Sequence, residues 1–386
     1  MVYNIKVRIE EKEYMKYSKL EKLGISPSTL GFGCMRFPKN EDRSINEPLA
    51  QKMLDEAIAQ GVTYIDTAYP YHGGESERFV GKALKKYPRD SFYLATKLPT
   101  WLVKEQSDVE KYLNEQLEKL QTNYVDFYLI HAVNKDRIAT IKDCKIIEEM
   151  IRLRDEGKIR YIGFSFHDDY EVFEEMINMY NWDFCQIQYN YVDTMIQAGD
   201  KGVALCEEKG IPLVIMEPIK GGSLAVLPDD IASMFKAYDP DASISSWALR
   251  FVASKKAVKV VLSGMSNYEH VVDNLATFNN FKPLNQEEEK LVEDVAKAIK
   301  AKTKNGCTGC QYCMPCPFGV NIPANFRFWN DYAMYGNKEV IHNRISGMEG
   351  FADQCKKCGK CEKMCPQSIK IREDLVKVVE EIGSLR

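Results

Sequence analysis

Eight of the twelve cysteines lie in two short groups near the end of the chain. Each group places three cysteines two residues apart and a fourth directly before a proline: Cys307, Cys310, Cys313 and Cys316, then Cys355, Cys358, Cys361 and Cys365. Three thiolates at this spacing can surround one iron–sulfur cubane, and the fourth typically binds the neighbouring cluster. The pattern therefore predicts two 4Fe-4S clusters held by these eight cysteines.

The same rule predicts that the two groups exchange their last ligand. One cluster is then expected on Cys307, Cys310, Cys313 and Cys365, and the other on Cys355, Cys358, Cys361 and Cys316. The first group is one residue shorter than the second before its last cysteine. Two alternatives stay open here: zinc in tetrahedral sulfur sites, or one group that is vestigial or holds a 3Fe-4S cluster.

Four further polar residues follow or end apolar runs in the N-terminal half. The stretch Gly61–Gly81, in which Tyr71 comes five residues after Asp66, closely resembles the first signature of the aldo-keto reductases. Lys97 in Ala-Thr-Lys-Leu and His131 in Tyr-Leu-Ile-His match the lysine and histidine of that family. The resemblance implies that Tyr71, Lys97, Asp66 and His131 form a catalytic tetrad.

The residue types explain why these four would work together. A free phenol has a pKa near 10, and a nearby ammonium favours the phenolate. Lys97 is expected to lower the pKa of Tyr71 in this way, while Asp66 holds Lys97 charged and oriented. His131 is expected to hydrogen-bond the substrate carbonyl, so that Tyr71 acts as general acid in reduction and base in oxidation.

The resemblance also implies a nicotinamide cofactor. Ser165 and Gln186 match residues of the family that contact the nicotinamide, although Phe166 and Met216 replace its usual asparagine and aromatic residue. A helix N-terminus can bind the pyrophosphate through its free N–H groups. The expected phosphate-binding loop and helix comprise Ser263, Gly264, Met265, Ser266, Asp273 and Asn274.

The choice between NADPH and NADH is left open by the sequence. Many family members grip the 2′-phosphate with a lysine and an arginine, where this chain has Gly264 and His270. Trp101 and His72 follow the runs that carry Lys97 and Tyr71, so they are candidates for the substrate pocket.

Eight short apolar runs, each followed by a helical pattern, must position these residues. Such runs are typical of parallel strands buried on both faces, and strand–helix units repeated eight times predict a (β/α)8 TIM barrel. The expected strands are 29–33, 63–68, 92–98, 124–131, 161–166, 184–189, 213–217 and 259–263.

The remaining chain is expected to form a second, small and mostly α-helical iron–sulfur domain. We expect residues 1–290 to form the barrel and residues 291–386 the cluster domain, with helical stretches at 285–304, 322–344 and 372–382. The long helical connection between the cysteine groups resembles α-helical dicluster ferredoxin domains.

Composition narrows the function classes. A net charge of −4 and 45% hydrophobic residues are typical of a globular protein with a mildly acidic surface, which argues against a nucleic-acid partner. Residues 1–19 lack the apolar run of a signal peptide, and no run is long enough to cross a membrane. A cytoplasmic location is therefore expected.

Together, the resemblance and the cysteine groups predict an oxidoreductase that exchanges hydride between NAD(P)H and a small carbonyl or alcohol substrate. The clusters would pass electrons to or from a redox partner protein. Because nicotinamide moves two electrons together and each cluster moves one, two alternatives remain. The cluster domain could be structural or a docking module, or the barrel could be a cofactor sensor without catalysis.

Overall fold

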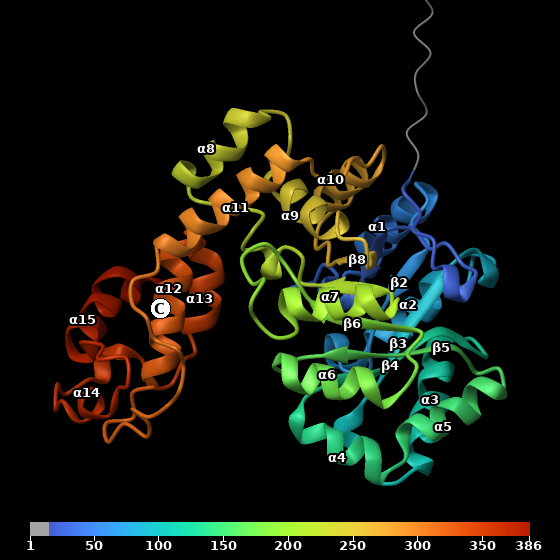
Figure 1. Ribbon diagram of the computed structural model, residues 1–386, viewed down its shortest axis with the longest axis horizontal. Helices are drawn as coiled ribbons and strands as arrows, with labels where there is room; N and C mark the ends of the chain where they lie inside the picture. The colour runs from blue at the N-terminus through green and yellow to red at the C-terminus, as the bar shows by residue number, and fades with distance from the viewer. Residues whose placement is uncertain (1–14) are drawn as a thin grey trace, which may run out of the picture. The chain divides into compact units, whose positions relative to one another are not determined.

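The computed structural model describes residues 15–386, which contain a closed barrel of eight strands (Figure 1). Neighbouring strands are parallel and follow one another around the barrel in chain order, with β8 pairing back to β1. The strands are β1 (Leu30–Gly33), β2 (Tyr64–Asp66), β3 (Tyr93–Leu98), β4 (Val125–Val133), β5 (Ile159–Phe166), β6 (Phe184–Gln188), β7 (Leu213–Met216) and β8 (Val258–Ser263).

The eight predicted strands are confirmed, and none of their ends differs by more than two residues. Strand β4 runs on to Val133 through a shift in its register against β5, and β7 has a similar shift against β8. Ala132 adopts a positive φ of 53° at the shift in β4. The strands are recognisable from sequence because most of their residues are apolar and buried on both faces.

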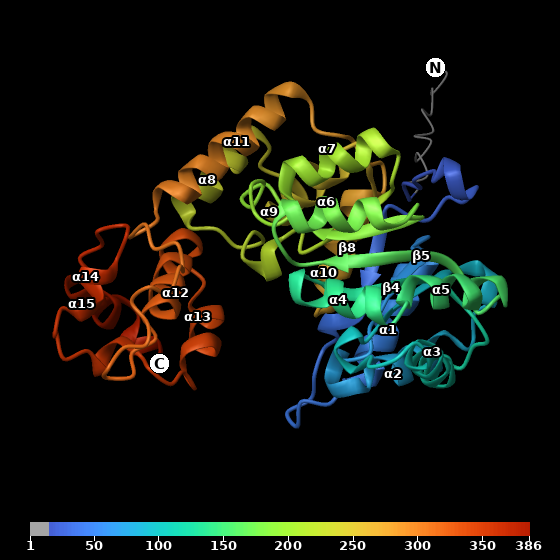
Figure 2. The same cartoon turned by 60° about the horizontal axis from the view of Figure 1, so that its bottom comes forward.

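Helices follow the strands and surround them, as Figure 1 and Figure 2 show. Their alternation with the strands confirms the predicted (β/α)8 architecture. The helices are α1 (Glu47–Ala59), α2 (Ser76–Leu84), α3 (Ser107–Leu120), α4 (Lys135–Asp143), α5 (Ile146–Asp155), α6 (Tyr170–Met179), α7 (Gly199–Lys209), α9 (Ile244–Ala253) and α10 (Tyr268–Phe278).

Aromatic rings fill the inside of the barrel. The Phe127 ring lies 4.9 Å from Tyr64 and 4.9 Å from Phe184, centroid to centroid. Gly163 makes room for this packing, because a Cβ there would lie only 2.6 Å from the Phe184 ring. The interior is therefore a packed core, and a reaction site has to lie at the mouth of the barrel.

The contacts divide the chain into two compact units. One comprises the chain up to Pro218 together with Ala248–Leu284, and the other comprises Ile219–Trp247 together with Asn285–Arg386. The second unit thus includes α8 (Asp229–Tyr238), which follows β7 and lies within the range predicted for the barrel. The domain boundary near residue 290 stays a prediction.

The second unit is helical. It consists of α8, α11 (Gln286–Ala301), α12 (Ile322–Tyr335), α13 (Lys338–Ile345), α14 (Lys360–Met364) and α15 (Ile371–Ile382). The predicted helical stretch 322–344 is divided in two, because Gly336 adopts φ 64° and Asn337 caps the next helix by accepting a hydrogen bond from Val340 N at 3.0 Å. Helices α8 and α11 lie side by side (Figure 1), joined by a 2.7 Å ion pair between Lys302 and Asp230.

None of the helices between residues 15 and 386 combines the length and the apolar character needed to cross a bilayer. We expected no signal peptide in residues 1–19. Residues 1–14 of that stretch lie outside the described residues.

Candidate functional site

The four candidate catalytic residues come together at the C-terminal ends of β2, β3 and β4. Asp66 is the last residue of β2, Lys97 is the next-to-last of β3, and His131 lies near the end of β4. Tyr71 begins a short 3-10 turn, Tyr71–Gly74, which directly follows β2. Because adjacent parallel strands end on the same side, residues 65 positions apart in the chain meet at one mouth of the barrel.

Lys97 is the centre of this group. Its Nζ donates to Asp66 Oδ1 at 2.6 Å, to the Thr67 carbonyl at 2.8 Å and to the Tyr71 hydroxyl at 3.4 Å. The Lys97 side chain is 1% exposed and that of Asp66 is 3% exposed. The three ammonium protons therefore have three acceptors, which fixes the position of a charge that would be costly to bury alone.

Burial and charge act in opposite directions on the two proton-carrying groups. Burial by itself would lower the pKa of Lys97, but Asp66 and Tyr71 raise it overall, so that Lys97 stays charged. Burial raises the pKa of Tyr71 above its usual value, and this exceeds the lowering by the Lys97 ammonium. The expected net lowering for Tyr71 is thus wrong for this structure, since desolvation of the phenolate outweighs one attractive charge.

His131 is held in its neutral form. Burial first, and then the charges of Lys97, His167 and Arg137, lower its pKa well below the usual value. Its ring lies 6.3 Å from that of Tyr71 and 5.3 Å from that of Trp101. Its Nδ1 is buried without a hydrogen-bond partner among the described residues. A neutral imidazole in this place can donate a hydrogen bond to a polar group that enters the barrel mouth.

Ser165 and Gln186 lie side by side on β5 and β6, where they are paired in register. Ser165 Oγ accepts a hydrogen bond from Ala132 N at 2.8 Å. Gln186 Nε2 lies 3.4 Å from the sulfur of Met216, while its Oε1 is buried and has no partner in the described part of the chain. A buried amide oxygen of this kind can accept a hydrogen bond from a bound ligand or water.

The loop after β8 leads into the N-terminus of α10. Ser263 Oγ accepts from Asn274 Nδ2 at 2.6 Å, and Asn267 caps the helix by accepting from His270 N at 2.8 Å. Ser266 N is 3.4 Å from His270 Nδ1. Met265 is 1% exposed, so it packs into the core and cannot present its side chain to a ligand. Asp273 lies half-buried in α10.

Arg36, which was not among the predicted site residues, covers Gly264. Arg36 ends the short turn after β1, and a Cβ added to Gly264 would lie 3.0 Å from Arg36 Cδ. Barrel closure explains this contact, because β1 and β8 are neighbours although they are far apart in sequence. The signal was available in the predicted strand order: in a closed barrel, the residue after the first strand lies beside the loop after the last.

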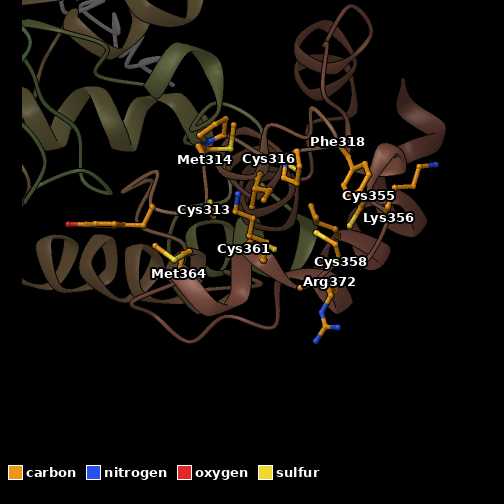
Figure 3. A pocket seen from close by; sticks show the side chains of 17 residues that line it. Cys313, Met314, Cys316, Phe318, Cys355, Lys356, Cys358, Cys361, Met364 and Arg372 are labelled. Carbon is orange, nitrogen blue, oxygen red and sulfur yellow. The ribbon is translucent and has the colours of Figure 1, made fainter.

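The eight clustered cysteines surround two cavities in the second unit. The larger, of about 150 Å³, is lined by Cys313 and by one expected cluster set (Figure 3): Cys316, Cys355, Cys358 and Cys361. The other cavity is lined by the second expected set: Cys307, Cys310, Cys313 and Cys365. Residues 15–386 hold no three metal-binding side chains close enough for a single ion.

Tight loops and a shared core position these thiols. Gly309, Gln311, Lys357 and Gly359 adopt positive φ values between 54° and 77°, which turns the chain around each cavity. Lys357 N donates to Cys355 Sγ at 3.4 Å. Six of the cysteines pack against a buried core that includes Val320, Phe326, Trp329, Phe351, Ile371 and Val378.

Comparison with known proteins matches two successive parts of the chain to two different families. Residues 29–297 match the aldo/keto reductase family, and residues 306–369 match a 4Fe-4S dicluster domain. An uncharacterized oxidoreductase of Bacillus subtilis is 26% identical over 322 residues, which cover 75% of this chain and 97% of that protein. The NADH-specific methylglyoxal reductase of Escherichia coli is 25% identical, covering 64% of this chain and 86% of that protein.

A solved structure resembles the barrel. The holo form of an aldo-keto reductase from Bacillus halodurans superposes with a TM-score of 0.63 at 28% identity, and it covers 74% of this chain and 97% of its own. About a quarter of the present chain therefore has no counterpart in that enzyme.

Proposed function

The chain belongs to the aldo/keto reductase family, and from this premise we propose that Tyr71, Lys97, Asp66 and His131 reduce a small carbonyl compound, or oxidise the corresponding alcohol, with NADPH or NADH. The observation that carries the proposal is the buried hydrogen-bonded group in which Lys97 joins Asp66 to Tyr71. The methylglyoxal reductase among its relatives acts on a small carbonyl compound by name.

The residues around the barrel mouth fit a nicotinamide dinucleotide. Gln186 Oε1 is a buried acceptor without a partner in the described chain, which suits the amide N–H₂ of a nicotinamide. The N-terminus of α10 offers free backbone N–H groups to a pyrophosphate. Arg36 adds a positive charge beside Gly264, the position at which many family members grip a 2′-phosphate with a lysine. When bound, the reduced nicotinamide supplies the hydride.

The chain's own residues then handle the carbonyl oxygen and the proton. His131, neutral because of its lowered pKa, donates a hydrogen bond to the carbonyl oxygen and orients it. Tyr71 holds its proton because burial raises its pKa, and it releases that proton to the oxygen as negative charge develops there. Lys97, kept charged by Asp66, stabilises the phenolate that results.

Replacement of the phenol tests this assignment. Tyr71→Phe removes only the hydroxyl, so that the barrel stays folded while carbonyl reduction falls by roughly 10²-fold or more, the usual contribution of a general acid. NADPH oxidation with a panel of small aldehydes measures the rate, and calorimetry with NADPH shows whether the cofactor still binds. Full activity in the variant would refute the role of Tyr71, and a wild type that binds neither nucleotide would favour the sensor alternative.

For the C-terminal domain we propose two 4Fe-4S clusters with an exchanged fourth ligand. The support is that each cavity is lined by the full set of four cysteines that the exchange requires. Anaerobically purified protein should contain about eight irons and eight sulfides per chain. Cys316→Ser and Cys365→Ser should each disturb a different cluster in the EPR spectrum. Zinc without sulfide would contradict the proposal.

The clusters are proposed to exchange single electrons with an acidic carrier protein. Cys358 is an exposed cysteine at the larger cavity, whose rim also carries the exposed hydrophobic residues Tyr312, Phe318 and Met364. Lys356, labelled in Figure 3, lines the same cavity, as does Lys360, and both would complement acidic side chains, whereas Arg372 is already paired with Glu362 at 2.7 Å. None of the twelve cysteines, all of which lie in the described residues, forms a disulfide, which suits a reducing compartment such as the cytoplasm.

Optical titration separates electron exchange from a purely structural role. If the two halves communicate, NADPH should bleach the cluster absorption, and aldehyde substrate should restore it. If the clusters are reduced by dithionite but never by NADPH, while aldehyde reduction proceeds at full rate, the cluster domain is structural or a docking module.

A further inference from the structure

Arg137 carries a positive charge that no acidic side chain of residues 15–386 neutralises. It lies in the first turn of α4, directly after β4, and is half-buried. Its Nε is buried without a hydrogen-bond partner, and its guanidinium forms no ion pair within residues 15–386. Two arginines at the opposite end of the barrel behave differently, since Arg89 and Arg160 both pair with Asp126. An unpaired buried guanidinium nitrogen is costly, which points to a partner that is not part of the chain.

This charge lies close to the proposed reaction site. Arg137 Cζ is 5.6 Å from the centroid of the Trp101 ring, and that ring is 5.3 Å from the ring of His131. Trp101 is 41% exposed, so this row of three side chains is open to solvent on one side. A ligand whose carbonyl group contacts His131 can therefore extend along Trp101 to the guanidinium.

The electrostatic surroundings of His131 also favour an anion. The charged and titratable groups that act on it are Lys97, His167 and Arg137, and all of them lower its pKa. The charge of Lys97 is already paired with Asp66. Of the acidic groups nearby, Glu217 acts on His167, and Asp168 accepts a hydrogen bond from Lys135 N at 2.7 Å at the start of α4. Among the cations that act on His131, Lys97 is paired and Arg137 forms no ion pair within residues 15–386.

We propose that Arg137 binds a carboxylate of the substrate, and that the enzyme prefers carbonyl compounds that bear a carboxylate a few bonds from the carbonyl group. This inference rests on the proposed carbonyl reduction. The planar guanidinium can hold a carboxylate through two parallel hydrogen bonds, while the Trp101 ring supports the carbon skeleton between the two ends. Arg137 would then select the substrate and leave the chemistry to Tyr71 and His131.

A matched pair of aldehydes tests this role. 4-Carboxybenzaldehyde carries the charge, and its methyl ester has nearly the same shape without it. Arg137→Met should lower kcat/KM for the acid by roughly 10- to 100-fold, mainly through KM, which corresponds to the loss of a hydrogen bond to a charged group. The ester should change by less than about twofold. Arg137→Lys should recover part of the loss for the acid, since it restores the positive charge but not the two parallel hydrogen bonds of a guanidinium.

A binding measurement keeps this test independent of catalysis. Calorimetry with 4-carboxybenzoate, in the presence of oxidised cofactor, should show binding to the wild type and roughly tenfold weaker binding to Arg137→Met. If the wild type reduces neither aldehyde but shows this difference, the proposed reaction fails and the anion site stands. If the variant affects acid and ester equally, or leaves 4-carboxybenzoate binding unchanged, Arg137 only packs on Trp101 and the proposal is overturned.

Discussion

The pairing of Asp66 with Lys97 can be tested by removing one charge. Asp66→Asn keeps the size of the side chain but replaces the carboxylate that accepts from Lys97 Nζ at 2.6 Å. The ammonium then retains two neutral acceptors, the Thr67 carbonyl at 2.8 Å and the Tyr71 hydroxyl at 3.4 Å. Because the lysine is buried, its charge is left without compensation.

The expected cost follows from this burial. Removing one member of a buried ion pair typically costs about 3 to 5 kcal/mol. In the wild type the pKa of Lys97 is raised, so its contribution to the free energy of unfolding is present below the unfolded pKa of about 10.4 and is lost above it. In the variant its pKa should fall below that value. The stability gap between the two proteins should therefore be largest near neutral pH and narrow as the pH rises.

The chain offers a matched control at the other end of the barrel. Asp126 is equally buried and accepts hydrogen bonds from Arg89 at 2.7 Å, Arg160 at 2.8 Å and Leu94 N at 2.9 Å. The two arginines are 24% and 46% exposed, so water can solvate them after Asp126→Asn. We expect this control to lose about 1 to 3 kcal/mol of stability and to keep its kcat within about twofold.

We would measure urea unfolding and steady-state aldehyde reduction for both variants between pH 6 and pH 10. These two measurements test whether Asp66 keeps Lys97 charged for catalysis. Asp66→Asn should lower kcat at least about tenfold, which is part of the roughly 10²- to 10⁴-fold that a general acid contributes. The reasoning is refuted if folded Asp66→Asn keeps the wild-type kcat and pH profile, or if Asp126→Asn loses as much activity.

Three further variants probe the packing, a titrating group and the cofactor. Gly81→Ala should lower the free energy of unfolding by about 1 to 3 kcal/mol, since its Cβ would lie 2.5 Å from the Lys119 carbonyl oxygen; unchanged urea unfolding would contradict this contact. The free energy of unfolding should fall less steeply below pH 6.5 in His131→Asn than in the wild type. The reason is that the pKa of His131 is lowered in the folded protein, so the unfolded chain binds the proton at a higher pH; an unchanged slope of stability against pH would show that other groups cause the fall. Arg36→Met should weaken NADPH binding and leave NADH binding nearly unchanged in calorimetry, and equal weakening of both would place Arg36 away from the 2′-phosphate.

Much of the fold and of the candidate site is readable from short stretches of sequence. Buried parallel strands are apolar over several consecutive residues, so all eight could be recognised without knowledge of their partners. Asp66 and Tyr71 are five residues apart, and Lys97 and His131 end the next two strands, so parallel topology alone brings them to one mouth. The cysteine spacing likewise predicts iron–sulfur ligands without knowledge of the fold.

Other properties depend on which distant residues meet. Gly336 interrupts a stretch that is helical by composition, and the segment around α8 joins the second unit although it follows a barrel strand. The approach of Arg36 to Gly264 follows from the closure of β8 on β1. Local sequence patterns do not predict such contacts, because the contacts depend on long-range packing.

The sequence by itself determined which residues could share the chemistry of this protein: a lysine to support a tyrosine, and eight thiols for two clusters. The tertiary structure decided their electrostatic balance. Burial raises the pKa of Tyr71 despite Lys97, and Arg137 finds no carboxylate within the described chain. Both results depend on how much water the whole fold excludes and which charges it brings together, and neither quantity is contained in the spacing of a motif.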